Sequence, residues 1–365
     1  METAANRKKD LRTGYTTGAC AAAAAKAAAI SLSAQREVSQ VEISLPGGGT
    51  AGFQVESCVF GPAEARCSVI KDAGDDPDVT HGGRICATVR WVEQSGIAIG
   101  RGEGVGLVTR PGLGLEIGSP AINPVPKMMI ASSVEEVLGL DPSGPGVEVV
   151  ISVPGGAELA KRTLNERLGI VGGLSILGTS GIVRPFSTSA YQACIAQALN
   201  VAVASGLVRV VLTTGGRTEK YARAVRPLPE EAFIQMGDFV GFALGQCAAK
   251  GIPDVAIVAM IGKMSKIAAG VFQTHASHSR VDTGFLAEIA RSCGLPPDMV
   301  SRTRESNTAR HFYEILPEPE AGRVFSRLCE VAAGRCRQHT RGRLNVECIL
   351  VAFDGQVLGR ALADA

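Results

Sequence analysis

The chain has 365 residues, of which 45% are apolar, 20% charged and only 4% aromatic. Its 37 Lys and Arg nearly balance 35 Asp and Glu, and the net charge of +2 excludes a general electrostatic attraction to nucleic acid. The few aromatic residues exclude a stacking surface for single strands. The length predicts two domains. Ten scattered cysteines without a Cys-x-x-Cys pair, and no apolar run near the roughly 20 residues of a membrane span, indicate a cytoplasmic protein without a membrane partner.

The segment after the N-terminus is rich in Ala. Residues 19–29 are almost all Ala and predict a helix, because Ala loses no side-chain entropy on entering one. Thr16 or Thr17 can cap the helix, and Gly14 loosens the backbone before it. Free N–H groups at a helix start attract anions. With Arg12 nearby, the segment predicts either an anion site or a purely structural helix cap.

The next part of the chain reads as short strands separated by Gly-rich turns. Apolar and polar residues alternate repeatedly over residues 41–110. A helix is predicted over residues 124–138, and the Pro- and Gly-rich residues 141–146 are the best linker. We therefore predict a β-rich first domain over residues 1–143, with a mixed, barrel-like sheet.

Beyond the linker, apolar runs alternate with Gly loops and helical segments. These runs lie at residues 147–153, 174–177, 208–212, 255–260 and 346–353. The rhythm predicts an α/β domain over residues 144–365 with a mostly parallel, Rossmann-like sheet, in which ligands bind beyond the carboxyl ends of the strands. No Gly-x-Gly-x-x-Gly fingerprint is present. Each Gly loop alone could also be an ordinary turn.

Several motifs, in order along nearly the whole chain, resemble those of the CbiD family, the cobalt-precorrin-5B C1-methyltransferases of the oxygen-independent cobalamin pathway. They lie at residues 12–20, 71–82, 109–114, 120–126, 178–185, 213–217 and 262–275. There is one departure: the family pattern leads us to expect Gly-His before Gly262 and Lys263, where this chain has Met260 and Ile261.

The resemblance implies methyl transfer from S-adenosylmethionine to ring carbon C1 of cobalt-precorrin-5B, giving cobalt-precorrin-6A. Cobalt is then part of the tetrapyrrole substrate, and the protein is expected to need no metal site of its own. The ring supplies the nucleophile, so the protein must chiefly position the reactants. A homo-oligomer and transient contacts with other enzymes of the pathway are compatible with this role. Two alternatives stay open, a nicotinamide-dependent reductase of the same pathway and a non-catalytic corrinoid or cobalt carrier.

The expected donor site consists of the Gly loops and an acidic partner for the ribose: Gly155, Gly156, Gly178, Thr179, Ser180, Gly181, Thr214, Gly215, Gly216 and Asp238. The carboxylates of the substrate call for cations and N–H donors, since Arg binds carboxylate with two parallel hydrogen bonds. The candidates are Arg12, Thr16, Thr17, Arg84, Arg110, Lys127, Arg184, Arg217, Lys263 and Lys266. For any single Arg, an ordinary solvated surface position is the alternative.

Two clusters offer groups for proton transfer. Residues 72–78 contain four Asp, which repel one another unless a cation or N–H donors compensate. Asp75 and the nearby His81 are candidate acid or base groups, and simple turn formation or a bound hard cation are the alternatives. His275 is the candidate in the second cluster, where an ordinary hydrogen-bonding role is the alternative.

Overall fold

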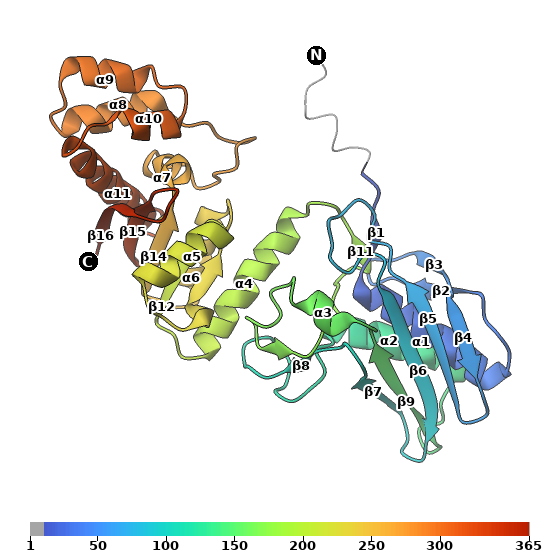
Figure 1. Cartoon of the computed structure of the whole chain (residues 1–365). Helices are drawn as coiled ribbons and strands as arrows, with labels where there is room; N and C mark the ends of the chain where they lie inside the picture. Colours follow the sequence, from blue (N-terminus) through green and yellow to red (C-terminus); the bar gives the residue numbers. More distant parts are fainter. Residues whose placement is uncertain (1–10, 365) are drawn as a thin grey trace. The chain divides into compact units, whose positions relative to one another are not determined.

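The structure is a computed structural model and describes residues 11–364. The chain forms two compact units, Met1–Ser187 and Thr188–Ala365 (Figure 1). Each unit is described by itself.

A buried Ala-rich helix lies at the centre of the first unit. Helix α1 (Thr17–Ala34) is capped by Thr16, whose side chain accepts a hydrogen bond from the N–H of Ala19 at 3.2 Å. Its small side chains let neighbours approach closely, and helix α2 (Pro124–Leu138) packs alongside it. A Cβ on Gly18 would stand 2.7 Å from the ring of Pro126. The sequence therefore identified both the helix and the reason for its composition.

By length and apolar composition, α1 is the one helix within residues 11–364 that could cross a membrane. Inside the unit, 78% of this helix is buried. Other side chains of the protein thus surround α1, as they surround the core helix of a globular domain.

Two antiparallel arrangements of strands pack on α1. The larger sheet has the order β4-β5-β6-β9-β7, and only the β7–β9 pair is parallel. The strands are β4 (Ser57–Phe60), β5 (Glu64–Ile70), β6 (Arg84–Val92), β7 (Ile97–Arg101) and β9 (Gly146–Ser152). A hairpin of β2 (Gln40–Ser44) and β3 (Thr50–Gln54) buries alternate residues. Both sheets are open, so the barrel-like closure that we predicted is wrong.

Strand β9 was expected to begin the second domain, but it lies inside the sheet of the first unit. It pairs with β6 from Cys86↔Ser152 to Val92↔Gly146 and with β7 on its other side. A strand with two partners cannot leave its sheet without breaking both ladders. The predicted boundary at 143/144 is therefore wrong, and the chain divides between Ser187 and Thr188.

The segments after β9 also differ from the predicted strand and helix pattern. Helix α3 (Gly156–Ala160) is only five residues long. Residues 174–177 form isolated bridges, from Leu174 to Val105 and from Ile176 to Ile122, in place of a strand. Four two-residue strands complete the unit: β1 (Gly14–Tyr15), β8 (Leu107–Val108), β10 (Ile170–Val171) and β11 (Ile182–Val183).

The second unit is built on a five-stranded sheet with the order β13-β12-β14-β15-β16, in which only β16 is antiparallel. The strands are β12 (Arg209–Thr213), β13 (Phe233–Gln235), β14 (Asp254–Ala259), β15 (Asn345–Val351) and β16 (Val357–Ala363). Val210 and Leu212 point into one core and Val211 into the other. Burial on both faces explains the continuous apolar runs in the sequence, and the mostly parallel sheet is confirmed.

Helices cover both faces of this sheet. The larger core includes residues of α4 (Thr188–Ala204), α6 (Val240–Ala249), α7 (Ile261–Ala268) and α11 (Glu320–His339). The smaller core lies under α5 (Gly216–Val225) and the 3-10 helix η2 (Glu230–Ala232). Three short helices complete the unit: α8 (Thr283–Ser292), α9 (Pro297–Arg304) and α10 (Ala309–Ile315). Helix α8 contacts α11, α10 contacts α7, and α9 packs on α8 and α10.

Candidate functional site

Three sequence-distant segments meet in the first unit, at the start of α1. Strand β1 pairs with β11 through Gly14↔Val183 and Tyr15↔Ile182. The N–H of Tyr15 also donates to the carbonyl of Asp72 at 2.7 Å. The residues before α1 therefore bring the acidic loop, residues 71–83, together with the loop at 178–186.

Two glycines permit this meeting. A Cβ on Gly14 would stand 2.1 Å from the carbonyl carbon of Ala73, and a Cβ on Gly74 would stand 2.1 Å from the oxygen of Arg12. Gly74 also has a φ of +67°, which favours glycine. The two backbones cross in direct contact, so neither position accepts a side chain without local movement.

Arg12 is bound to the acidic loop in this structure. Its guanidinium forms two hydrogen bonds with the carboxylate of Asp72, one of them 3.0 Å long, and its backbone N–H donates to Asp75 Oδ2 at 2.7 Å. The hydrogen bond from Arg12, followed by one from the N–H of Gly74, lowers the pKa of Asp72 to about 2. The same pairing raises the pKa of Arg12. Arg12 thus orders the loop that carries the candidate proton-transfer groups.

The other carboxylates of the loop have partners of their own. Lys71 is only 1% exposed and pairs with Asp78 at 2.7 Å, and Asp78 also accepts two hydrogen bonds from Thr80. Burial opposes ionisation of Asp78, but these bonds outweigh it and lower its pKa. Asp76 accepts the N–H of Phe186 at 3.0 Å. Hydrogen-bond donors and cations of the protein therefore compensate the repulsion among the four Asp carboxylates.

No group of three or more His, Cys, Asp or Glu within residues 11–364 is arranged to bind a metal ion. The compensation that we expected from a cation or from N–H donors comes, in this part of the chain, from Arg12, Lys71 and the backbone.

His81 is fixed by one backbone hydrogen bond. Its Nδ1 accepts the N–H of Ala73 at 3.1 Å and lies 3.8 Å from Asp72 Oδ1. Because Nδ1 accepts, the neutral ring carries its proton on Nε2. The exposed ring of His81 therefore offers a donor at Nε2.

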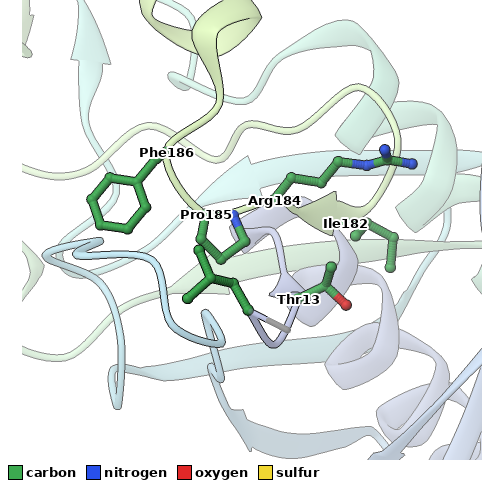
Figure 2. A pocket seen from close by; sticks show the side chains of 6 residues that line it. Thr13, Ile182, Arg184, Pro185 and Phe186 are labelled. Atoms are coloured by element: carbon green, nitrogen blue, oxygen red, sulfur yellow. The ribbon is translucent and has the colours of Figure 1, made fainter. Parts of the chain in front are cut away.

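A pocket of about 440 Å³ opens beside the β1–β11 pair (Figure 2). Its lining residues are Leu11, Thr13, Ile182, Arg184, Pro185 and Phe186. Phe186 was missed from the sequence, although it directly follows the motif at residues 178–185. Its φ of +54° is rare for a residue with a bulky side chain, and the ring is 63% exposed. A strained backbone that presents an aromatic ring to solvent is typical of a functional site.

The loop at 178–181 is packed against the start of α1. Gly178 has a φ of +131°, and a Cβ there would stand 2.4 Å from the side chain of Thr16. Thr17 exchanges hydrogen bonds with the backbone of Leu177 at 3.0 and 3.2 Å. Thr16 and Thr17 are buried, so their hydroxyls join the loop to the helix, whereas Thr179 and Ser180 are exposed.

The remaining predicted residues of the first unit have separate surroundings. Arg84 lies 3.5 Å from Glu56, and Arg110 donates to the carbonyl of Arg167 at 3.0 Å. Lys127 is half-buried in the first turn of α2. Gly155 and Gly156 follow β9, and Gly156 packs against Gly104.

A second cluster lies at the carboxyl ends of three parallel strands in the other unit. Lys263 Nζ lies 3.0 Å from Asp238 Oδ1 and within 3.5 Å of the carbonyls of Thr214 and Gly237. Thr274 donates to the same Asp238 oxygen at 2.8 Å. Burial opposes ionisation of Asp238, but the bonds from Lys263 and Thr274 outweigh it and lower its pKa.

This arrangement leaves space for a ligand. Gly215 has a φ of +153°, and a Cβ there would meet nothing within 4 Å. Gly216 and Arg217 of α5 are exposed beside it. Within residues 11–364, neither the ion pair nor the hydrogen bond of Asp238 uses its second oxygen, Oδ2.

Lys266 is buried and donates to the carbonyls of Thr274 and Ser279 at 2.8 and 2.9 Å. It therefore fixes the loop that carries His275, whose side chain is exposed and bonded to Ser277 at 2.6 Å. Lys266 is thus a buried residue that supports the loop, whereas His275 is an exposed residue of the loop itself.

The predicted donor residues are divided between the units. Gly155, Gly156 and residues 178–181 belong to the first unit, whereas residues 214–216 and Asp238 belong to the second. The expectation of one row of Gly loops along a single sheet is therefore wrong, because β9 and residues 174–177 are not strands of the second sheet.

Comparison with known proteins agrees with the division of the chain into two units. The CbiD family profile matches residues 4–185, and the profile of the CbiD C-terminal domain matches residues 273–362. A protein of Geobacillus sp. (strain WCH70), named cobalt-precorrin-5B C(1)-methyltransferase, is 50% identical over 97% of this chain and 98% of its own length. The chain belongs to the CbiD family. The predicted family resemblance is thus confirmed.

Other CbiD relatives cover the chain equally well. A protein of the same name from Rubrobacter xylanophilus is 50% identical over 95% of this chain and 90% of its own. One from Leptospira borgpetersenii is 46% identical over 96% and 95%. The crystal structure of the cobalamin biosynthesis protein CbiD from Archaeoglobus fulgidus is 32% identical, covers 73% of this chain and 83% of that chain, and has a TM-score of 0.38.

Proposed function

We propose that this CbiD protein transfers a methyl group from S-adenosylmethionine to C1 of cobalt-precorrin-5B, giving cobalt-precorrin-6A in anaerobic cobalamin biosynthesis. The observation that carries the proposal is identity of about half the residues, over nearly the full length, to proteins named for this methyl transfer. A soluble tetrapyrrole substrate also agrees with a cytoplasmic location, which we propose with it.

The reaction requires little chemistry from the protein. An electron pair of the ring system forms the new bond from C1 to the methyl carbon, while the sulfonium sulfur keeps the pair of the broken bond and becomes a thioether. Bringing the sulfur, methyl and carbon atoms into line can lower the barrier by roughly 7–11 kcal/mol at best. A proton released from the methylated ring needs an acceptor.

The acidic loop of the first unit is the proposed site of proton transfer. Asp75 binds the N–H of Arg12 through Oδ2, so its other oxygen is the acceptor that we assign. His81 offers N–H at Nε2, because Nδ1 accepts from Ala73. We assign it the role of hydrogen-bond donor to the substrate, with proton acceptance left to Asp75. His275 lies on an exposed loop of the second unit, and we assign it a contact with the substrate.

The carboxyl edge of the second sheet is the proposed donor site, and we propose with it that the second unit is a Rossmann-like domain. Acidic side chains at this edge bind ribose hydroxyls in other nucleotide-binding sheets. Asp238 is ionised by its partners and has Oδ2 available, and Gly215 leaves room for close approach of a ligand to the backbone.

The reaction is tested by anaerobic incubation of the protein with cobalt-precorrin-5B and methyl-labelled S-adenosylmethionine, followed by mass spectrometry. We expect a corrinoid that has gained one labelled methyl group, together with S-adenosylhomocysteine. Binding of the corrinoid without transfer would contradict the proposal and support a carrier. Reduction of the substrate with a nicotinamide cofactor would support the reductase.

The donor site is tested separately by titrating S-adenosylhomocysteine into variants. Asp238→Asn removes a charged acceptor, and we expect affinity to fall by about 10- to 100-fold. Asp254→Asn is the matched control, because Asp254 begins β14 at the opposite end of the same sheet and pairs with Arg209. Equal affinities for the two variants would remove Asp238 from the donor site.

A further inference from the structure

We propose that the pocket at residues 182–186 binds one edge of the tetrapyrrole, with the Phe186 ring packed flat against the macrocycle and Arg184 bound to a peripheral carboxylate. This inference rests on the proposed function. It adds to that function a specific contact surface and one residue, Phe186, that the sequence did not indicate.

Arg184 supplies the cation of the proposed subsite. Among the described residues, the other arginines near this meeting point have partners: Arg12 binds Asp72, and Arg84 lies near Glu56. Arg184 lines the pocket (Figure 2). Its side chain is exposed, and within residues 11–364 it has no ion pair or side-chain hydrogen bond. A guanidinium with its donors unused suits a carboxylate, which it can bind with two parallel hydrogen bonds.

Phe186 supplies the aromatic surface of the proposed subsite. Its positive φ is a strained conformation for a residue with a bulky side chain, and the hydrogen bond from its N–H to Asp76 stabilises it. This conformation leaves the ring 63% exposed at the pocket, where no aromatic partner stacks on it among the described residues. An exposed aromatic ring suits a flat conjugated ligand, because an offset-stacked pair of aromatic rings gains more than the burial of its surface alone.

The pocket itself combines apolar and polar side chains. Leu11, Ile182 and Pro185 supply apolar walls, while Thr13 and Arg184 supply polar groups. A tetrapyrrole edge has the same mixture, since an apolar ring carries acidic side chains. The volume of about 440 Å³ admits part of such a molecule and leaves the rest outside.

Asp76 has a positioning role in this arrangement. It touches only the backbone of Phe186, yet it fixes the direction of the ring. Asp76→Ala should therefore weaken binding in the same way as loss of the ring, and Asp76→Asn, which keeps an oxygen acceptor, should restore it. In the Asp76→Ala, Phe186→Leu double variant the two losses should not add, because both act through one ring.

The test uses two stable corrinoids as probes, cobyrinic acid with free carboxylate side chains and cobinamide with amidated ones. Affinities are measured by calorimetry on the full chain, and single-turnover methyl transfer is measured on the same preparations. We expect Phe186→Leu to weaken both probes about tenfold. We expect Arg184→Ala to weaken cobyrinic acid about 10- to 100-fold and cobinamide hardly at all, with partial recovery in Arg184→Lys.

Two matched controls exclude general effects of charge and surface. Arg66→Ala removes an exposed Arg of β5 that has no ion pair within residues 11–364, and Phe60→Leu removes an exposed Phe of β4, both in the same unit. Both should bind the probes like the wild type.

Each outcome decides the inference. Site variants that behave like these controls, in a protein that still transfers methyl groups, overturn the subsite and leave the proposed function standing. A wild-type protein that binds cobyrinic acid through Phe186 and Arg184 but transfers no methyl group overturns the reaction and supports the subsite. A wild-type protein that binds neither probe overturns the subsite, and the methyl-transfer assay on the same preparation then decides the reaction.

Discussion

The crossing of Gly14 and Gly74 predicts a destabilisation whose steric part can be isolated. In Gly74→Ala, the new Cβ would stand 2.1 Å from the oxygen of Arg12 and 2.6 Å from the carbonyl carbon of Thr13. Both distances are far inside the roughly 3.5–4.0 Å of normal contact. Overpacking of this kind typically costs about 1–3 kcal/mol, and the left-handed backbone adds about 1–2 kcal/mol for a residue with a Cβ.

Gly82→Ala is the matched control for the backbone term. Gly82 lies in the same loop with a φ of +73°, close to the +67° of Gly74, but a Cβ there would meet nothing within 4 Å. The conformational cost and the change in unfolded-state entropy are therefore nearly equal in the two variants. The difference between their free energies of unfolding should be about 1–3 kcal/mol and should report the crossing alone.

Urea unfolding followed by tryptophan fluorescence measures this difference. The single Trp of the sequence, Trp91, lies on β6 and therefore reports on the first unit. Gly74→Ala should also weaken corrinoid binding, because the backbone of Arg12 must shift away from Asp75. Equal unfolding free energies for Gly74→Ala and Gly82→Ala, with unchanged m-values, would refute the reasoning, since the backbones would then separate without cost.

Three further predictions concern the same unit. Asp78→Ala leaves the buried Lys71 unpaired and should cost about 3–5 kcal/mol in urea unfolding; adding Lys71→Met should recover most of the loss, and no recovery would contradict the account. Arg12 lowers the pKa of Asp72 from 3.8 to about 2, so the stabilisation is complete above about pH 4 and is lost as pH falls toward 2. Stability should therefore fall more steeply over this range in the wild type than in Asp72→Asn, and parallel curves would disprove the linkage. Ala24→Leu should destabilise by about 1–3 kcal/mol or more, because Ala24 in α1 is fully buried, and an unchanged midpoint would show that the helix has free space around it.

The local sequence determined much of the fold. The Ala-rich helix, its cap at Thr16 and the apolar runs of β12, β14 and β15 follow from helix propensity and from burial on two faces, which act over a few residues. Family membership was also readable, because motifs along nearly the whole chain matched one pattern in order. The chemistry that we propose follows from that match.

Only the tertiary structure decided which segments meet. The run at 147–153 resembles a buried strand of either unit, and nothing local reveals that β9 pairs with β6 and β7 in the first. Likewise, the contacts of Arg12 with Asp72 and of Phe186 with Asp76 join residues far apart in the chain. Periodicity reports whether a segment is buried. The pairing partners of a strand, and the lack of a partner for Arg184 within residues 11–364, depend on contacts between distant residues, and these exist only once the chain has folded.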